Sequence, residues 1–226
     1  MSIVISFTTM LVAKNIHKKF GELPILKGID ITINKKEIVC IVGSSGAGKT
    51  TLLQILGTLD RPDLGTIELY GEDILSLEKK KLAQFRNKKL GFIFQFHQLL
   101  PEFTAVENVI LPALIGGTTK SESVDKAEEL LDFLGMSHRL EHKPSELSGG
   151  EQQRIAVARA LINSPEIIFA DEPSGNLDSK NSDELHDLFF RLKDEFDQTF
   201  VIVTHNNNLA DMADVKYEMR DGLIVQ

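Results

Sequence analysis

The chain has 226 residues, of which 42% are hydrophobic, and its formal net charge at pH 7 is -8. This length suffices for the core of one compact domain, with room for an inserted subdomain. The acidic balance and the lack of a long Lys/Arg block argue against nucleic acid as a partner. No apolar stretch approaches the roughly 20 residues that a membrane-spanning helix needs.

The first stretch of the chain, MSIVISFTTMLVA, is apolar and uncharged, without the positive beginning of a signal peptide. We expect either a first strand with a frayed start or a chain that truly begins at Met10. The single cysteine, Cys40, lies within IVCIV and cannot form an internal disulfide. It is therefore expected to be a small core residue of a protein in a reducing compartment, and a nucleophilic role is the weaker alternative.

Strand-like patterns recur along the chain. GIDITIN (28–34) alternates Ile with polar residues, and EIVCIVG (37–43) is continuously apolar, as a strand buried on both faces is. A short strand is expected at TIELYG (66–71). Further apolar runs of buried-strand length are LGFIFQ (90–95), EIIFADE (166–172) and TFVIVTH (199–205). If these strands are parallel, their polar ends meet at one edge, where ligands of open α/β sheets bind.

Helical patterns occupy most of the remaining chain. Apolar residues recur at helical spacing at Ala127, Leu130, Leu131 and Leu134, and no strand-like run interrupts 120–163. We therefore expect one domain, 1–226, with a helical subdomain inserted at roughly 96–163. A second amphipathic helix is predicted from Leu185, Leu188, Phe189, Leu192 and Phe196. The lysines at 79–81 and 88–89 are expected on a solvated helix face. The DG pair in VKYEMRDGLIVQ predicts a terminal hairpin.

The stretch VGSSGAGKTTLL has the spacing G-x-x-x-x-G-K-T between a strand and a helix, which is typical of a phosphate-binding loop. Backbone N–H groups and the helix N-terminus converge on the phosphates. Lys49 is expected at the β/γ oxygens and the Thr50 hydroxyl at Mg²⁺. A chance glycine-rich turn is the alternative. The predicted nucleotide-binding residues are Gly43, Ser44, Ser45, Gly46, Ala47, Gly48, Lys49, Thr50 and Thr51.

Four polar residues at strand ends are candidates for catalysis. Asp171 is expected to hold Mg²⁺ through water, and Glu172 to polarise the attacking water as general base. His205 is a candidate either to donate to a γ-phosphate or to hold the water that Glu172 activates, and the Gln95 amide is a candidate bridge between metal and water. Adjacent acids are often only a solvated turn, and a lone His or Gln at a strand end is usually structural.

The stretch PSELSGGEQQR contains Ser148, Gly149, Gly150 and Glu151, the S-x-x-E pattern of a capping box, and predicts a helix beginning near Gly149. A hydroxyl and glycine amides at a helix N-terminus are also a second anion site. Because the chain has only one phosphate loop, this second site fits a nucleotide held by another subunit.

LSGGE, together with the phosphate loop, ADE and His205, resembles the ATPase subunits of ABC transporters over nearly the whole chain. The resemblance implies an α/β P-loop NTPase (RecA-like) fold: a mostly parallel sheet core, an N-terminal antiparallel β subdomain and an inserted α-helical subdomain. It further implies ATP hydrolysis with Mg²⁺ in a head-to-tail dimer with a second copy, in which Ser148 and the glycines face the partner's γ-phosphate. The implied partners are integral membrane permease subunits, at the cytoplasmic face of the inner membrane.

The resemblance also assigns individual residues. Gln95 corresponds to the Q-loop residue, Asn176 and Asp178 belong to the D-loop that crosses the dimer seam, and Phe20 falls where an aromatic ring stacks on adenine. Phe20 departs from the commoner Tyr but keeps its π face. Glu151 departs from the commoner Gln, and since a carboxylate repels phosphate, we expect it to face back into the capping box.

Two stretches, FQFHQLLPEFTAVENV (94–109) and PSGNLDS (173–179), are similar to a subgroup that contains lipoprotein-releasing, macrolide-export and cell-division ATPases. The first is nearest in wording to the lipoprotein-releasing members, and it follows the Q-loop, where the family docks its membrane subunits. The sequence therefore favours an ATP-driven dimer that closes and opens to drive a permease, with lipoprotein release as the first candidate.

Other functions fit the sequence less well. A soluble, non-transport ABC ATPase usually carries a coiled-coil insertion or a second ATPase half, and a GTPase should show N/T-K-x-D where this chain has THNNN. A P-loop kinase would have no use for LSGGE. His138–His142 reads H-x-x-E-H, an inverted zinc-protease pattern, but nothing supplies the third ligand that zinc needs.

Overall fold

The computed structural model describes residues 9–225, so the predicted frayed beginning before Thr9 lies outside the described residues. The chain divides into two compact units. The first holds the residues up to Leu82 and from Arg191 onward, and the second runs from Ala83 to Phe190. Helices α2 (Lys79–Lys89) and α6 (Ser179–Phe196) contain the two points where the chain passes between them.

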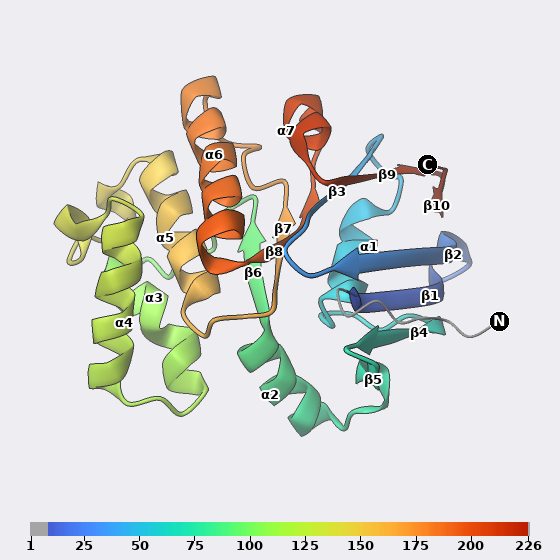
Figure 1. Ribbon diagram of the computed structural model, residues 1–226, viewed down its shortest axis with the longest axis horizontal. Coiled ribbons are helices and arrows are strands. Elements are labelled where there is room, and N and C mark those ends of the chain that lie inside the picture. Colours follow the sequence, from blue (N-terminus) through green and yellow to red (C-terminus); the bar gives the residue numbers. More distant parts are fainter. Residues whose placement is uncertain (1–8, 226) are drawn as a thin grey trace. The chain divides into compact units, whose positions relative to one another are not determined.

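An antiparallel sheet forms one part of the first unit. Its strand order is β2-β1-β4-β5, and all three pairings are antiparallel (Figure 1). Its strands are β1 (Thr9–Phe20), β2 (Leu23–Asn34), β4 (Leu64–Leu69) and β5 (Glu72–Asp73). The predicted N-terminal antiparallel β subdomain is therefore confirmed, and Met10 lies buried within its first strand.

Parallel strands form the other part of the first unit. Strand β3 (Ile38–Gly43) pairs in parallel with both β8 (Thr199–Val203) and β9 (Val215–Arg220). The side chains of Ile38 to Ile41 are fully buried, which agrees with the unbroken apolar sequence. Within this strand Cys40 is a core residue, as expected. Burial raises the pKa of its thiol to about 12, so it is not a nucleophile at neutral pH.

Short elements complete the first unit: α1 (Lys49–Leu56), the 3₁₀ turn η1 (Ile74–Ser76), α7 (Asn207–Met212) and β10 (Leu223–Ile224). Strand β10 pairs antiparallel with β9 and confirms the predicted terminal hairpin. Its turn residues, Asp221 and Gly222, both have positive φ, 49° and 80°, as a two-residue hairpin turn requires.

The second unit combines a parallel strand pair with a helical group. Its elements are β6 (Leu90–Phe94), β7 (Ile167–Asp171), α3 (Ala105–Ile115), α4 (Lys120–Phe133), α5 (Gly149–Leu161) and the 3₁₀ turns η2 (Ser137–Arg139) and η3 (Pro144–Glu146). Strands β6 and β7 are parallel. Helices α3, α4 and α5 pack against one another, and capping boxes at Thr104, Thr119 and Ser148 start them (Figure 1).

The helical content of 120–163 agrees with the prediction, whereas the existence of a separate subdomain at 96–163 stays a prediction. Lys79, Lys80 and Lys81 are exposed on α2, as expected.

The prediction for the apolar face of α6 was wrong at one residue: Phe196, which was expected on that face, is 49% exposed. It is the last residue of the helix, and Asp197, with φ 53°, turns the chain away there. No helix within residues 9–225 combines the length and apolarity needed to cross a bilayer.

The terminal hairpin supports the loop between β3 and α1. The Gly222 N–H donates to the Ala47 carbonyl at 3.2 Å, and the Gly222 carbonyl accepts from Lys27 N–H at 3.0 Å. A Cβ on Gly222 would lie 2.2 Å from the Ile25 carbonyl oxygen. At Gly43 a Cβ would lie 2.2 Å from the Met219 carbonyl oxygen. At both Gly43 and Gly222 the backbone of another segment is therefore too close for any side chain.

We predict that Gly222→Ala destabilises the protein far more than Gly71→Ala. Gly71 has nearly the same φ, 78° against 80°, but nothing lies within 4 Å of its missing Cβ. Gly71→Ala should therefore show only the conformational cost of about 1 kcal/mol. Gly222→Ala must also displace backbone, and should cost a further ~2 kcal/mol or more. Urea unfolding midpoints measure the difference, and equal midpoints for the two variants would contradict this account of the hairpin.

Candidate functional site

The loop from Gly43 to Gly48 joins the carboxyl end of β3 to the start of α1, which is the context that the phosphate-loop motif requires. The Lys49 ammonium donates to the carbonyls of Gly43 and Ser44, at 2.9 and 3.0 Å. The first turn of α1 carries no acidic residue. An ammonium and an uncompensated helix N-terminus therefore lie at one glycine-rich loop, which is an arrangement suited to anions.

His205 lies at the same edge of the first unit's parallel strands. The register of β3 and β8 pairs Ile41 with Val203, and the Thr204 N–H donates to the Ile41 carbonyl at 3.2 Å. A tight turn follows, in which Asn206 N–H donates to the Thr204 hydroxyl at 3.0 Å. The exposed side chain of His205 is thereby held at the strand end that the phosphate loop follows.

Phe20, the last residue of β1, presents an open ring. Its side chain is 55% exposed, and the Lys18 ammonium lies 5.5 Å from the ring centre. The π face is thus able to interact with a flat or cationic group. Its stacking on adenine stays a prediction.

In the second unit, β6 and β7 bring the other predicted strand-end residues together. Their register pairs Phe94 with Asp171, so Gln95 and Glu172 both begin beyond the same edge. Glu172 has φ 46°, a left-handed conformation that a non-glycine residue adopts at a cost of about 1 kcal/mol. Such strain is concentrated at functional sites.

Gln95 and Asn176, the predicted Q-loop and D-loop residues, contact each other directly. Asn176 Nδ2 donates to the Gln95 carbonyl at 3.0 Å, and Gln95 Nε2 lies 3.5 Å from Asn176 Oδ1. The sequence predicted both residues separately but gave no sign of this contact, because the two lie far apart in the chain. These two contacts link the segment after β6 to the segment after β7.

The LSGGE stretch, residues 147–151, which we call the signature turn, has the predicted capping box. Glu151 N–H donates to the Ser148 hydroxyl at 3.3 Å, and Ser148 N–H donates to the Glu151 carboxylate at 2.8 Å. The Arg139 guanidinium also binds that carboxylate, at 2.8 Å. The bond from the Ser148 backbone and the Arg139 charge hold the pKa of Glu151 below its usual value. The expectation that Glu151 faces back into the capping box is confirmed.

The start of α6 lies against this turn. Asp178 accepts from Asn181 N–H at 2.8 Å and from Asn181 Nδ2 at 2.7 Å, and these bonds lower the pKa of Asp178. The Asn181 amide oxygen lies 2.6 Å from where a side chain at Gly150 would begin. Arg154 on α5 pairs with Glu184 on α6 at 2.8 Å. The sequence gave no sign of this role for Asn181, although Asp178 is of a residue type favoured at the N-caps of helices.

A buried histidine, His186 on α6, contacts Ser174, which lies two residues before Asn176. His186 Nε2 lies 3.1 Å from the Ser174 hydroxyl and 3.4 Å from the Ser182 hydroxyl. Burial lowers the pKa of His186, so the ring is neutral at pH 7. It is a core residue, and its contact with Ser174 joins α6 to the segment that follows β7.

The predicted Mg²⁺ ligands are a hydroxyl, an amide and a carboxylate: Thr50, Gln95 and Asp171. These oxygen donors are of the kind that Mg²⁺ prefers. Among residues 9–225, no group of three or more His, Cys, Asp and Glu side chains is placed to hold a metal on its own. Each of the three is a donor that Mg²⁺ accepts beside water and phosphate oxygens.

Comparisons with known proteins agree with these features. The family model described as ABC transporter matches residues 26–175. The chain is 63% identical over 212 residues to the lipoprotein-releasing system ATP-binding protein LolD of Porphyromonas gingivalis, which covers 94% of this chain and 97% of that protein. It is 58% identical over 216 residues to LolD of Cytophaga hutchinsonii, which covers 96% and 99%.

Solved structures give the same result. The dimeric structure of MJ0796, a bacterial ABC transporter cassette, matches with a TM-score of 0.87 and 38% identity, over 96% of this chain and 97% of that one. A dimeric post-hydrolysis state of MJ0796 bound to ADP and Pi matches equally well. The predicted α/β P-loop NTPase fold is confirmed. The chain therefore belongs to the ABC transporter family, as the ATPase cassette of such a transporter.

Proposed function

We propose that this chain is the ATPase of a lipoprotein-releasing system, which hydrolyses ATP in a head-to-tail dimer and thereby drives integral membrane permease subunits. The observation that carries the proposal is identity of 63% and 58%, over nearly the full length of both chains, to proteins named LolD. Macrolide-export and cell-division ATPases of the same subgroup are the alternatives, because the phosphate loop and signature do not distinguish them.

The chemical roles follow from the residue types. The amides of the phosphate loop and the Lys49 ammonium bind the phosphates, and the Phe20 ring stacks on adenine. Glu172 accepts a proton from the water that attacks the γ-phosphorus, while the bond to the bridging oxygen breaks and ADP leaves. Gln95 orients that water, and His205 donates to the γ-phosphate. Thr50, Gln95 and Asp171 would hold Mg²⁺, which would neutralise negative charge on the phosphates.

The second copy supplies the other half of each site. Ser148, Gly149 and Gly150 donate to the γ-phosphate bound by the partner, and Asn176 and Asp178 lie at the seam. What supports this is that Ser148 and Gly149 are exposed at the N-terminus of a 13-residue helix in a chain with a single phosphate loop. Since hydrolysis removes the γ-phosphate, it weakens the contact to the signature, and the dimer opens.

The surface after the Q-loop is the proposed docking site for the permease. Phe96, Leu100 and Phe103 expose 71%, 42% and 36% of their area within one loop. Exposed apolar side chains gathered on one segment are typical of an interaction surface. A permease docked there places the chain at the cytoplasmic face of the membrane.

We predict that the tagged chain, purified from membranes of its own cells, brings permease subunits with it. Reconstituted in vesicles, this complex should release a fluorescent lipoprotein to a soluble acceptor only with ATP and Mg²⁺. The matched control is the same lipoprotein with its lipidated Cys replaced by Ser, which requires no release. A complex whose ATPase is stimulated but which never releases the lipidated form would contradict lipoprotein release and favour the alternatives.

We predict that Lys49→Ala lowers ATP hydrolysis by on the order of 100-fold or more, because it removes the one side-chain cation that the loop directs at the phosphates. Lys36→Ala is the control, since that lysine pairs with Asp197 at the surface, at 2.6 Å, and should leave turnover within about twofold. Phosphate release under saturating ATP measures both. Near-normal turnover of Lys49→Ala would show that the loop does not bind the reacting phosphates.

We predict that Glu172→Gln lowers kcat by about 10² to 10⁴ while ATP still binds, since the amide keeps the shape but cannot accept the proton. The trapped triphosphate should then produce a dimer in size-exclusion chromatography with ATP but not with ADP. Glu141→Gln, at an exposed position, should remain like the wild type. A strict monomer at every ATP concentration would contradict the ATP-bridged dimer.

A further inference from the structure

The loop 96–104, which we call the docking loop, is fixed at its far end by a buried amide. Asn108 on α3 is fully buried and accepts from Leu100 N–H at 2.7 Å. Its Nδ2 donates to the carbonyls of Leu100, Phe103 and Thr104, at 3.1, 3.2 and 3.0 Å. The loop therefore presents its apolar side chains from a rigid frame.

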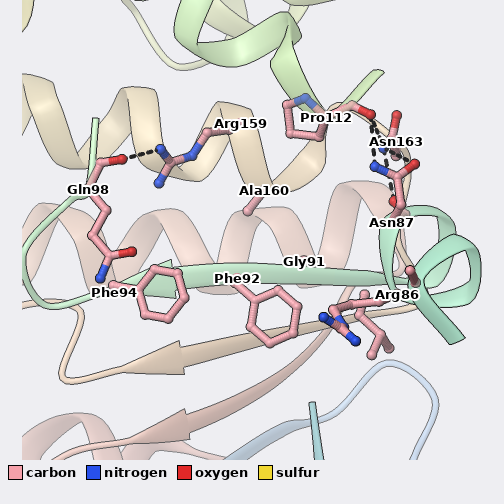
Figure 2. A pocket seen from close by; sticks show the side chains of 12 residues that line it. Arg86, Asn87, Gly91, Phe92, Phe94, Gln98, Pro112, Arg159, Ala160 and Asn163 are labelled. Carbon is pink, nitrogen blue, oxygen red and sulfur yellow. Dashed lines mark hydrogen bonds between the residues drawn. The ribbon is translucent and has the colours of Figure 1, made fainter. Parts of the chain in front are cut away.

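The near end of the docking loop is fixed to the signature helix α5. Arg159 donates from Nη1 to the Gln98 carbonyl at 2.6 Å and from Nη2 to the His97 carbonyl at 2.7 Å. Figure 2 shows the guanidinium reaching from α5 to the Gln98 backbone, at the edge of a cavity that both residues line. Gln98 has φ 50°, so the two hydrogen bonds from Arg159 hold a strained turn.

A second contact joins the same two elements. Gln153 on α5 is fully buried, and its Oε1 accepts from His97 Nδ1, while its Nε2 is the one buried side-chain polar atom within residues 9–225 that lacks a partner. The neighbouring Gln152 donates to the carbonyls of Pro144 and Leu147, at 3.0 and 3.1 Å. The row of polar side chains on α5 thus reaches from the docking loop to the residues just before Ser148.

We propose that Arg159 and Gln153 are positioning residues that make the docking loop and the signature helix move as one body. Arg159 lies eleven residues after Ser148, which is about 17 Å along a helix that rises 1.5 Å per residue. A force on the docking loop therefore reaches the hydroxyl at the other end of α5. This inference rests on the proposed function, because the force comes from the permease and the hydroxyl acts on the second copy's nucleotide.

A purely structural role for these residues predicts different behaviour. If Arg159 and Gln153 only stabilise the fold, substitutions should lower every activity in proportion to the loss of folded protein. A positioning role leaves basal hydrolysis and the KM for ATP near the wild-type values and removes the response to the partner.

The first test uses hydrogen exchange on the isolated chain and needs no permease. In Arg159→Met and in Gln153→Leu, peptides from 96–104 and from 147–153 should both exchange at least threefold faster, while peptides from α4 stay unchanged. Arg191→Met is the control, since that arginine pairs with Glu195 within α6 at the surface. Faster exchange confined to 96–104, or none in either peptide, would overturn the proposal.

The second test uses the complex purified from membranes. In Arg159→Met the stimulation of ATP hydrolysis by the permease should fall at least fivefold, with basal kcat and KM within twofold of wild type. Arg159→Lys, which keeps the charge but lacks the planar fork of the guanidinium, should show a stimulation between those of the wild type and Arg159→Met. Equal loss of basal and stimulated rates, or full stimulation, would overturn the proposal. A wild-type complex without any stimulation would instead refute the proposed function, and the exchange experiment would still decide this one.

Discussion

Helix N-termini that lack internal acceptors are the physical constraint on which this molecule depends. The first N–H groups of any α-helix have no partner within the helix. At α1 no acidic side chain compensates them, and Lys49 adds a further positive charge. At α5 the Ser148 hydroxyl and the Glu151 carboxylate provide a cap. A hydroxyl that accepts from Glu151 N–H still has its own proton to donate. Capping the helix and binding a phosphate are therefore compatible at Ser148.

The carboxylate of that cap would repel a phosphate if it were unpaired. Arg139 binds Glu151 and so reduces the negative field near the signature turn. The H-x-x-E-H pattern, which resembled a metal motif, thus contains a residue with an electrostatic role, and His142 Nε2 lies 3.1 Å from the same guanidinium. The departure from the commoner Gln at the signature is accommodated by a partner that the local sequence does not reveal.

The sequence predicted the features that depend on local pattern. Buried strands were placed within one or two residues, because short, unbroken apolar runs such as IVCIV are typical of strands buried on both faces. Capping boxes and the DG hairpin were likewise readable. The polar anchors were not: Asn108, Arg159 and His186 act through contacts with backbone or side chains elsewhere in the fold, and no spacing encodes such a contact. The prediction for Phe196 was wrong for another reason: the helical spacing of apolar residues continues beyond the point where the core ends.

The energetics of the proposed dimer follow from its two seams. To move the dimer from about 99% open to about 99% closed, the ligands must favour the closed state by about 5.5 kcal/mol. Two nucleotides need then supply about half of that each, which one or two hydrogen bonds to a charged group provide, at roughly 1.5–3 kcal/mol apiece. In the proposed dimer, the Ser148 hydroxyl and the amides of Gly149 and Gly150 are donors of the number required. Loss of one γ-phosphate removes one seam's share and returns the dimer to balance between its two states, where a permease on the docking loop can decide the outcome.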